Sequence, residues 1–191
     1  KKVDVFIKAC SENLGDVFVY SDVDIQFFGP LKQVLLDELG DFDIAIQNDH
    51  LGGMCSGFFV CRANENTLKM FQSMKDNESK YLEDQHALNM NLHFVKFKPL
   101  SDRFWTFGIN KTQWKNQNFD IPEGILMHHA NWTEGIQNKT TLLNFVRQKY
   151  EMKKLVKSNI DDYQNFLFRY FEEFRPNPTY PTYPAYLTGK Y

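Results

Sequence analysis

Two aspartates separated by one residue interrupt a run of strand-forming residues near the start of the chain. Residues 17–20 have the β-branched and aromatic content of a buried strand, so Asp22 and Asp24 are expected where that strand ends. In open α/β sheets, ligands bind beyond the carboxyl ends of the strands. Paired carboxylates there are hard oxygen ligands, suited to Mg²⁺ or Mn²⁺ carrying a phosphorylated substrate.

A second pair of the same spacing, Asp41 and Asp43, allows a comparison within the chain. This pair precedes the strand-like residues 44–47, so it is expected at the opposite edge of the sheet, in a turn. The first pair, taken alone, is open to a structural as well as a functional interpretation.

A second polar group follows another predicted strand, which begins at residue 125. That strand ends in His128 and His129, and Asn131, Gly135 and Lys139 follow in a segment that enters a helix. An isolated histidine is usually structural, but a neutral imidazole at a strand end can complete a metal site with two carboxylates. Lys139 follows at a spacing that can bring its ammonium group to a diphosphate.

Two further segments are candidates for substrate contacts. Residues 48–57 form a polar, glycine-rich stretch that is long for a structural turn, and Ser56 can donate to a hydroxyl or a phosphate. Asp84 and Gln85 open a predicted helix. Acids at a helix start are explained by capping alone, and the alternative is that both side chains face the cleft of the aspartate pair.

The remaining pattern predicts an α/β fold with a mixed, mostly parallel sheet flanked by helices. Helical spacing is present in residues 3–14, 31–38 and 64–77, and residues 93–98 alternate as a half-exposed edge strand does. Residues 1–150 are expected to form the functional domain, residues 151–175 a C-terminal helix, and residues 176–191 a tail rich in proline and tyrosine.

Composition excludes some partners. The chain has 191 residues, 42% of them hydrophobic, and a net charge of -2 without a basic stripe, which argues against nucleic acid. We expect no membrane span and no signal peptide at its start. Three cysteines without a metal-binding pattern are expected as free thiols and favour a reducing compartment such as the cytoplasm, whereas Asn-x-Ser/Thr sequons are compatible with the secretory pathway.

These motifs together resemble a known family. Tyr-Ser-Asp-Val-Asp-Ile from residue 20, Gly-Gly-x-x-Ser-Gly-Phe-Phe from residue 52, Glu-Asp-Gln from residue 83 and His-x-Asn-Trp-x-x-Gly-x-x-x-Lys from residue 129 occur in this order. The combination resembles nucleotide-diphospho-sugar transferases of the type-A glycosyltransferase fold. In such enzymes the strands that bind the nucleotide precede the Asp-x-Asp pair by some eighty residues or more. The chain is therefore expected to correspond to the later part of that domain.

The resemblance implies a metal-dependent hexosyl- or pentosyltransferase. Its donor would be a nucleotide-sugar, with a UDP-sugar favoured, and its acceptor a carbohydrate or a protein. Asp22, Asp24 and His129 would bind Mn²⁺ or Mg²⁺ on the diphosphate. The other implied contacts are Asp22, Asn131, Gly135 and Lys139 for the donor, Gly53, Ser56 and Gly57 beside the donor sugar and acceptor, and Asp84 and Gln85 at the sugar, with Asp84 as the best candidate for a base.

Several alternatives stay open at this stage. Either stereochemical outcome is compatible with the motifs. A phosphatase of the haloacid dehalogenase type also places Asp-x-Asp after a strand, but that class does not explain the segment from His129 to Lys139. A catalytically silent carbohydrate-binding or structural module is the other alternative.

Overall fold

A computed structural model of the chain describes residues 1–49, 53–81, 83–108 and 119–158. The chain divides into two compact units, Lys1–Val146 and Arg147–Tyr191. The described residues of the second unit continue the helix α5 (Ile136–Ser158). The rest of the helix predicted for residues 151–175, and the tail predicted for residues 176–191, lie outside the described residues.

The first unit contains the predicted mixture of strands and helices, arranged around two sheets. A four-stranded sheet has the order β1-β4-β3-β5, and a three-stranded sheet has the order β2-β7-β6. The strands are β1 (Val17–Ser21), β2 (Ile25–Phe27), β3 (Ile44–Asn48), β4 (Met54–Arg62), β5 (Phe97–Pro99), β6 (Phe104–Thr106) and β7 (Met127–His129).

The mixed α/β class is confirmed, but the expected majority of parallel pairings is not found among the described strands. β1–β4, β2–β7 and β3–β4 pair antiparallel, and only β3–β5 and β6–β7 are parallel. β3 and β4 follow each other closely along the chain, and neighbours joined by so short a connection pair antiparallel.

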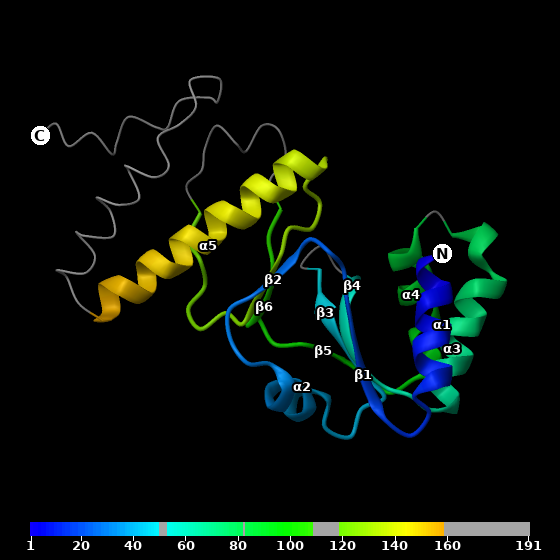
Figure 1. Ribbon diagram of the computed structural model, residues 1–191. Helices are drawn as coiled ribbons and strands as arrows, with labels where there is room; N and C mark the ends of the chain where they lie inside the picture. Colours follow the sequence, from blue (N-terminus) through cyan, green and yellow to red (C-terminus); the bar gives the residue numbers. More distant parts are fainter. Residues whose placement is uncertain (50–52, 82, 109–118, 159–191) are drawn as a thin grey trace, which may run out of the picture. The chain divides into compact units, whose positions relative to one another are not determined.

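Three helices, α1 (Lys2–Glu12), α3 (Glu65–Asp76) and α4 (Asp84–Asn91), lie together on one face of the four-stranded sheet (Figure 1). Successive residues of a strand point to opposite faces, and β4 supplies both sides of the core in this way. Phe59 packs with the three helices, whereas Phe58 packs with α2 (Lys32–Leu39) and the three-stranded sheet. The predicted helices at residues 3–14, 31–38 and 64–77 are therefore confirmed.

Two segments differ from the prediction. Residues 54–57 of the predicted glycine-rich loop belong to a strand, because β4 begins at Met54, and its central residues are buried. Residues 93–98 were predicted as one strand, but a short 3-10 helix (Leu92–Phe94) precedes β5, which is indeed an edge strand. The alternation of charged and apolar residues there does not distinguish a strand from a turn of 3-10 helix followed by a shorter strand.

The cysteines agree with the expectation of free thiols, since Cys10, Cys55 and Cys61 are all unbridged and buried. In the part of the chain that the structure describes, no helix combines the length and the apolar character needed to cross a bilayer.

Candidate functional site

Strand pairing brings the aspartate pair and the second histidine together. The chain leaves the four-stranded sheet after β1 and enters the three-stranded sheet at β2, and Asp22 and Asp24 lie in this crossing. β2 pairs with β7 so that Ile25 faces His129, and the amide of Ala130 donates to the carbonyl of Asp24 at 3.0 Å. The register of one antiparallel pair therefore fixes the neighbourhood of Asp24 and His129.

Asp22, Asp24 and His129 form a compact group of oxygen and nitrogen atoms. One ligand atom from each side chain lies within 4.8 Å of the other two. His129 Nε2 is 3.4 Å from Asp24 Oδ1, and both residues are buried. These donors are the oxygen and imidazole ligands that Mn²⁺ and related divalent ions accept.

Gln47 sets the orientation of the His129 ring. The Gln47 amide nitrogen donates to the Phe104 carbonyl at 3.1 Å, which leaves its oxygen facing His129 Nδ1 at 2.9 Å. Nδ1 therefore carries the proton of the neutral ring, and the Nε2 lone pair faces the two carboxylates. A neutral imidazole nitrogen and two carboxylates are ligands that a divalent cation accepts, so the side chains fit such an ion.

Because Gly57 has no side chain, there is room beside it for the side chains of His129 and Asp22. The backbone amide of Asp22 donates to the Gly57 carbonyl at 2.7 Å, which draws β4 against the site. A Cβ atom at Gly57 would lie 2.4 Å from His129 Cε1 and 2.8 Å from Asp22 Oδ2. Glycine is therefore required here for close approach rather than for an unusual backbone conformation.

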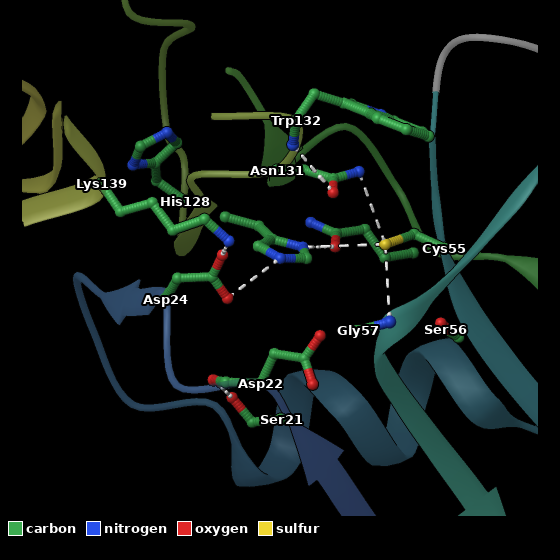
Figure 2. Close-up of polar contacts among 12 residues, drawn as sticks. Ser21, Asp22, Asp24, Cys55, Ser56, Gly57, His128, Asn131, Trp132 and Lys139 are labelled. Atoms are coloured by element: carbon green, nitrogen blue, oxygen red, sulfur yellow. Dashed lines mark hydrogen bonds and ion pairs between the residues drawn. The ribbon is translucent and has the colours of Figure 1, made fainter. Parts of the chain in front are cut away.

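Lys139 supplies a positive charge on the other side of Asp24. Its Nζ atom lies 2.5 Å from Asp24 Oδ2 (Figure 2). Burial alone would raise the pKa of Asp24, but the contacts with His129 and Lys139 outweigh that effect and hold the pKa of this carboxyl well below its ordinary value. Asp24 is therefore an anion at neutral pH.

An open cleft of about 510 Å³ adjoins these residues. The aspartate segment lines one side, and the first turn of α5 lines the other with Gly135, Ile136 and Lys139. The free amides and the dipole at a helix start attract anions, and Lys139 adds to the same attraction. The cleft thus combines a candidate cation site with a candidate anion site.

Lys2 is a site residue that the sequence did not reveal. Its Nζ atom lies 2.9 Å from Asp22 Oδ2 and 2.9 Å from Asp84 Oδ2, so one ammonium group bridges the two carboxylates. Ser56 Oγ donates to the same Asp84 oxygen at 2.5 Å. Burial acts to raise the pKa of Asp84, but the contacts with Ser56 and Lys2 lower it overall. Ser56 and Asp84 are thereby linked to Asp22.

Gln85 and Asn131 meet at a different carboxylate, that of Asp49, which the sequence also did not reveal. Asp49 accepts hydrogen bonds from Gln85, Asn131 and Trp132. The Asn131 amide nitrogen donates to Asp49. The same nitrogen also faces the Cys55 sulfur (Figure 2). Gln85 and Asn131 therefore share one hydrogen-bond network around the buried Asp49.

Gly53 and His128 have other surroundings. Gly53 stands before β4, where its carbonyl accepts from the Asp49 backbone amide at 2.9 Å and an added Cβ would meet the side chain of Asn89. His128 points away from Asp22 and Asp24 (Figure 2) and lies 2.9 Å from the Phe107 carbonyl and 3.0 Å from the Gln26 amide. Burial lowers the pKa of His128 to about 4, so it is a neutral structural residue.

Asp43 has the structural role expected for the second aspartate pair. Its carboxylate accepts from the amide of Asn64 and from the backbone of Lys96. It therefore fastens the start of β3 to two neighbouring segments.

Comparison with solved structures identifies similar folds. The glycosyltransferase GlyE of Streptococcus pneumoniae TIGR4 aligns with 18% identity over 92% of this chain and 48% of GlyE, at a TM-score of 0.51. Its apo form aligns with 19% identity over 87% of this chain and 45% of that structure, at 0.52. The galactosyltransferase LgtC, in complex with donor and acceptor sugar analogs, aligns with 14% identity over 73% of this chain and 64% of LgtC, at 0.46.

The GlyE structures show a glycosyltransferase fold, and the chain spans about half of their length. No protein in the curated set of sequences matches the chain significantly. The profile of one family, described as nucleotide-diphospho-sugar transferase, matches residues 12–143, which include both carboxylates, the histidine and the lysine of the cleft. The chain belongs to the nucleotide-diphospho-sugar transferase family.

Proposed function

We propose that this chain carries the metal and diphosphate site of a glycosyltransferase that moves a sugar from a nucleotide-diphosphate-sugar, preferably a UDP-sugar, to an acceptor hydroxyl. The observation that carries the proposal is the orientation of His129. Its Nε2 atom is turned by Gln47 toward Asp22 and Asp24, beside a cleft bounded by Lys139 and a helix start.

In this proposal Asp22, Asp24 and His129 hold a Mn²⁺ or Mg²⁺ ion. An ion held by these side chains would supply positive charge for the diphosphate leaving group. Lys139 and the first amides of α5 bind the phosphates from the other side of the cleft. Because Lys139 pairs with Asp24 in the structure, we expect its ammonium group to shift toward the phosphates when the donor binds. This is electrostatic stabilisation of the leaving group.

Asp84 is better suited to hold a hydroxyl than to remove its proton. Its lowered pKa makes it a weak base, and Lys2 and Ser56 already engage one of its oxygens. Its second oxygen can accept a hydrogen bond from a sugar hydroxyl. We therefore propose that Asp84 binds the sugar, with Gln85 beside it on the same helical turn.

The phosphatase alternative receives less support from this geometry. That class uses the second aspartate of the pair as a general acid. Contacts with His129 and Lys139 hold the pKa of Asp24 well below its ordinary value, which makes this carboxyl a poor proton donor. The extended segment from His129 to Lys139 also has no role in that chemistry.

The proposal is tested by incubating the protein with UDP- and GDP-sugars and Mn²⁺, and by measuring release of nucleoside diphosphate. We expect release that requires the metal and disappears in Asp24→Asn. Asp37→Asn, on the exposed face of α2, is the matched control and should keep full activity. Metal binding without any release would support the silent module instead, and inorganic phosphate released from simple phosphomonoesters would contradict the transferase assignment.

A further inference from the structure

Asp49 is a buried carboxylate that accepts hydrogen bonds from three side chains on two different segments. Its Oδ1 atom accepts from Asn131 Nδ2 and from Trp132 Nε1, each at 2.8 Å. Its Oδ2 atom accepts from Gln85 Nε2 at 2.9 Å. Only 5% of Asp49 is exposed, so these donors replace water around its charge.

The contact with Asp49 determines which end of the Gln85 amide is available. The nitrogen must face Asp49, because a carboxylate can only accept hydrogen bonds. Gln85 Oε1 then points away from Asp49, and the described residues provide no donor for it. Gln85 therefore presents an acceptor oxygen next to Asp84, on the first turn of α4.

Trp132 anchors the other oxygen of Asp49. Its backbone has a φ of 60°, in the left-handed region that a bulky residue rarely adopts. The indole N–H bond to Asp49 compensates for this strain and holds the corner after β7. With Trp132 and Asn131 fixed on Oδ1, Asp49 cannot turn away from Gln85.

We propose that Asp49 is a positioning residue that fixes the amide of Gln85 with its oxygen toward the substrate, so that Gln85 accepts a hydrogen bond from a sugar hydroxyl. This inference rests on the proposed glycosyl transfer. Gln85 contacts the sugar and Asp49 acts through it. An amide that is already fixed does not pay the entropic cost of settling into one of two orientations when the sugar binds.

The test exchanges the hydrogen-bond donor and acceptor between Gln85 and Asp49. In Asp49→Asn the new amide nitrogen faces Gln85, so Gln85 turns over and presents its nitrogen in place of its oxygen. In Gln85→Glu two carboxylates oppose each other. The double variant Asp49→Asn/Gln85→Glu restores a donor facing an acceptor, and the second oxygen of the introduced carboxylate again faces the substrate.

We expect each single variant to lower kcat for metal-dependent nucleoside diphosphate release at least about tenfold, and the double variant to recover most of this loss, as coupled neighbours do. Mn²⁺ affinity should stay unchanged in all of them. The same exchange at Gln33 and Asp37, an exposed pair on α2 with the same hydrogen bond, is the matched control and should have no effect.

A double variant no better than the single variants, with Mn²⁺ binding and unfolding midpoints intact, would overturn the inference and leave the proposed function standing. Absence of release by the unmodified protein would reject both. If Asp49→Asn fails to fold, Gln85→Ala decides the question, because Gln85 is only half buried. Its kcat should fall at least about tenfold, as neighbours in one network do, and an unchanged kcat would overturn the inference.

Discussion

Replacing Gly57 with alanine tests whether the close approach of β4 to the metal ligands matters. The added Cβ would lie 2.4 Å from His129 Cε1, about 1 Å short of the distance at which two carbon atoms pack. Neither neighbour can move freely, because Gln47 holds the imidazole and Tyr20 and Lys2 hold Asp22. Metal ligands tolerate displacements of only about 0.2 Å.

We therefore expect Gly57→Ala to weaken Mn²⁺ binding about 10- to 100-fold, the effect typical of disturbed support around metal ligands. Overpacking should also lower the free energy of unfolding by about 1–3 kcal/mol. Gly29→Ala is the control, since its Cβ would meet only Leu126 Cδ2 at an ordinary 3.5 Å. Calorimetric titration with Mn²⁺ and urea unfolding measure the two effects. Unchanged Mn²⁺ affinity in Gly57→Ala would refute the assignment of this corner as the metal site.

Three further outcomes are expected. Asp24→Asn should abolish Mn²⁺ binding and, because it removes a buried anion that Lys139 and His129 contact, should also lower the free energy of unfolding by about 1–3 kcal/mol; unchanged Mn²⁺ binding in the folded variant would mean that the pair is structural. His129→Ala should weaken Mn²⁺ binding far more than His128→Ala, which should instead lower the unfolding midpoint, and equal effects on binding would reject the distinction. Folding lowers the pKa of His128 from 6.5 to about 4. The neutral ring therefore contributes about 3 kcal/mol to the free energy of unfolding above pH 6.5, and this contribution is lost as the pH falls toward 4. The dependence of stability on pH should be weaker in His128→Gln, and an unchanged dependence would contradict the burial of a neutral ring.

The site residues that motifs revealed are those with a distinctive local spacing. The sequence placed Asp22 and Asp24 after a strand and His129 at the end of another, and pairing of β2 with β7 brings them together. Strand alternation implies that His128 and His129 point to opposite faces, and the His-x-Asn motif selected His129 as the ligand.

Lys2 and Asp49 could not be found in this way. Lys2 lies twenty residues before Asp22 on the surface of an ordinary amphipathic helix, and only the packing of α1 on the sheet brings its ammonium group to Asp22 and Asp84. Asp49 follows a strand next to a glycine-rich turn, where aspartate is common. For both residues the informative contacts are long-range, and no local pattern encodes them.

Gln47 did leave a signal in the sequence. It ends the apolar run of β3, and a buried amide in such a run needs hydrogen-bond partners. That signal predicts a polar contact but not its partner. The order of the strands in the sheet was less predictable. β4 begins at Met54, directly after the short connection from β3, and the sequence at its start resembles a loop.

The most direct test of the central claim is anomalous diffraction from crystals grown with Mn²⁺ and a nucleoside diphosphate. We predict one strong manganese peak about 2 Å from oxygens of Asp22 and Asp24 and from His129 Nε2, with the phosphates beside Lys139 and the first turn of α5. A manganese peak elsewhere, or a diphosphate that does not contact Lys139, would contradict the account.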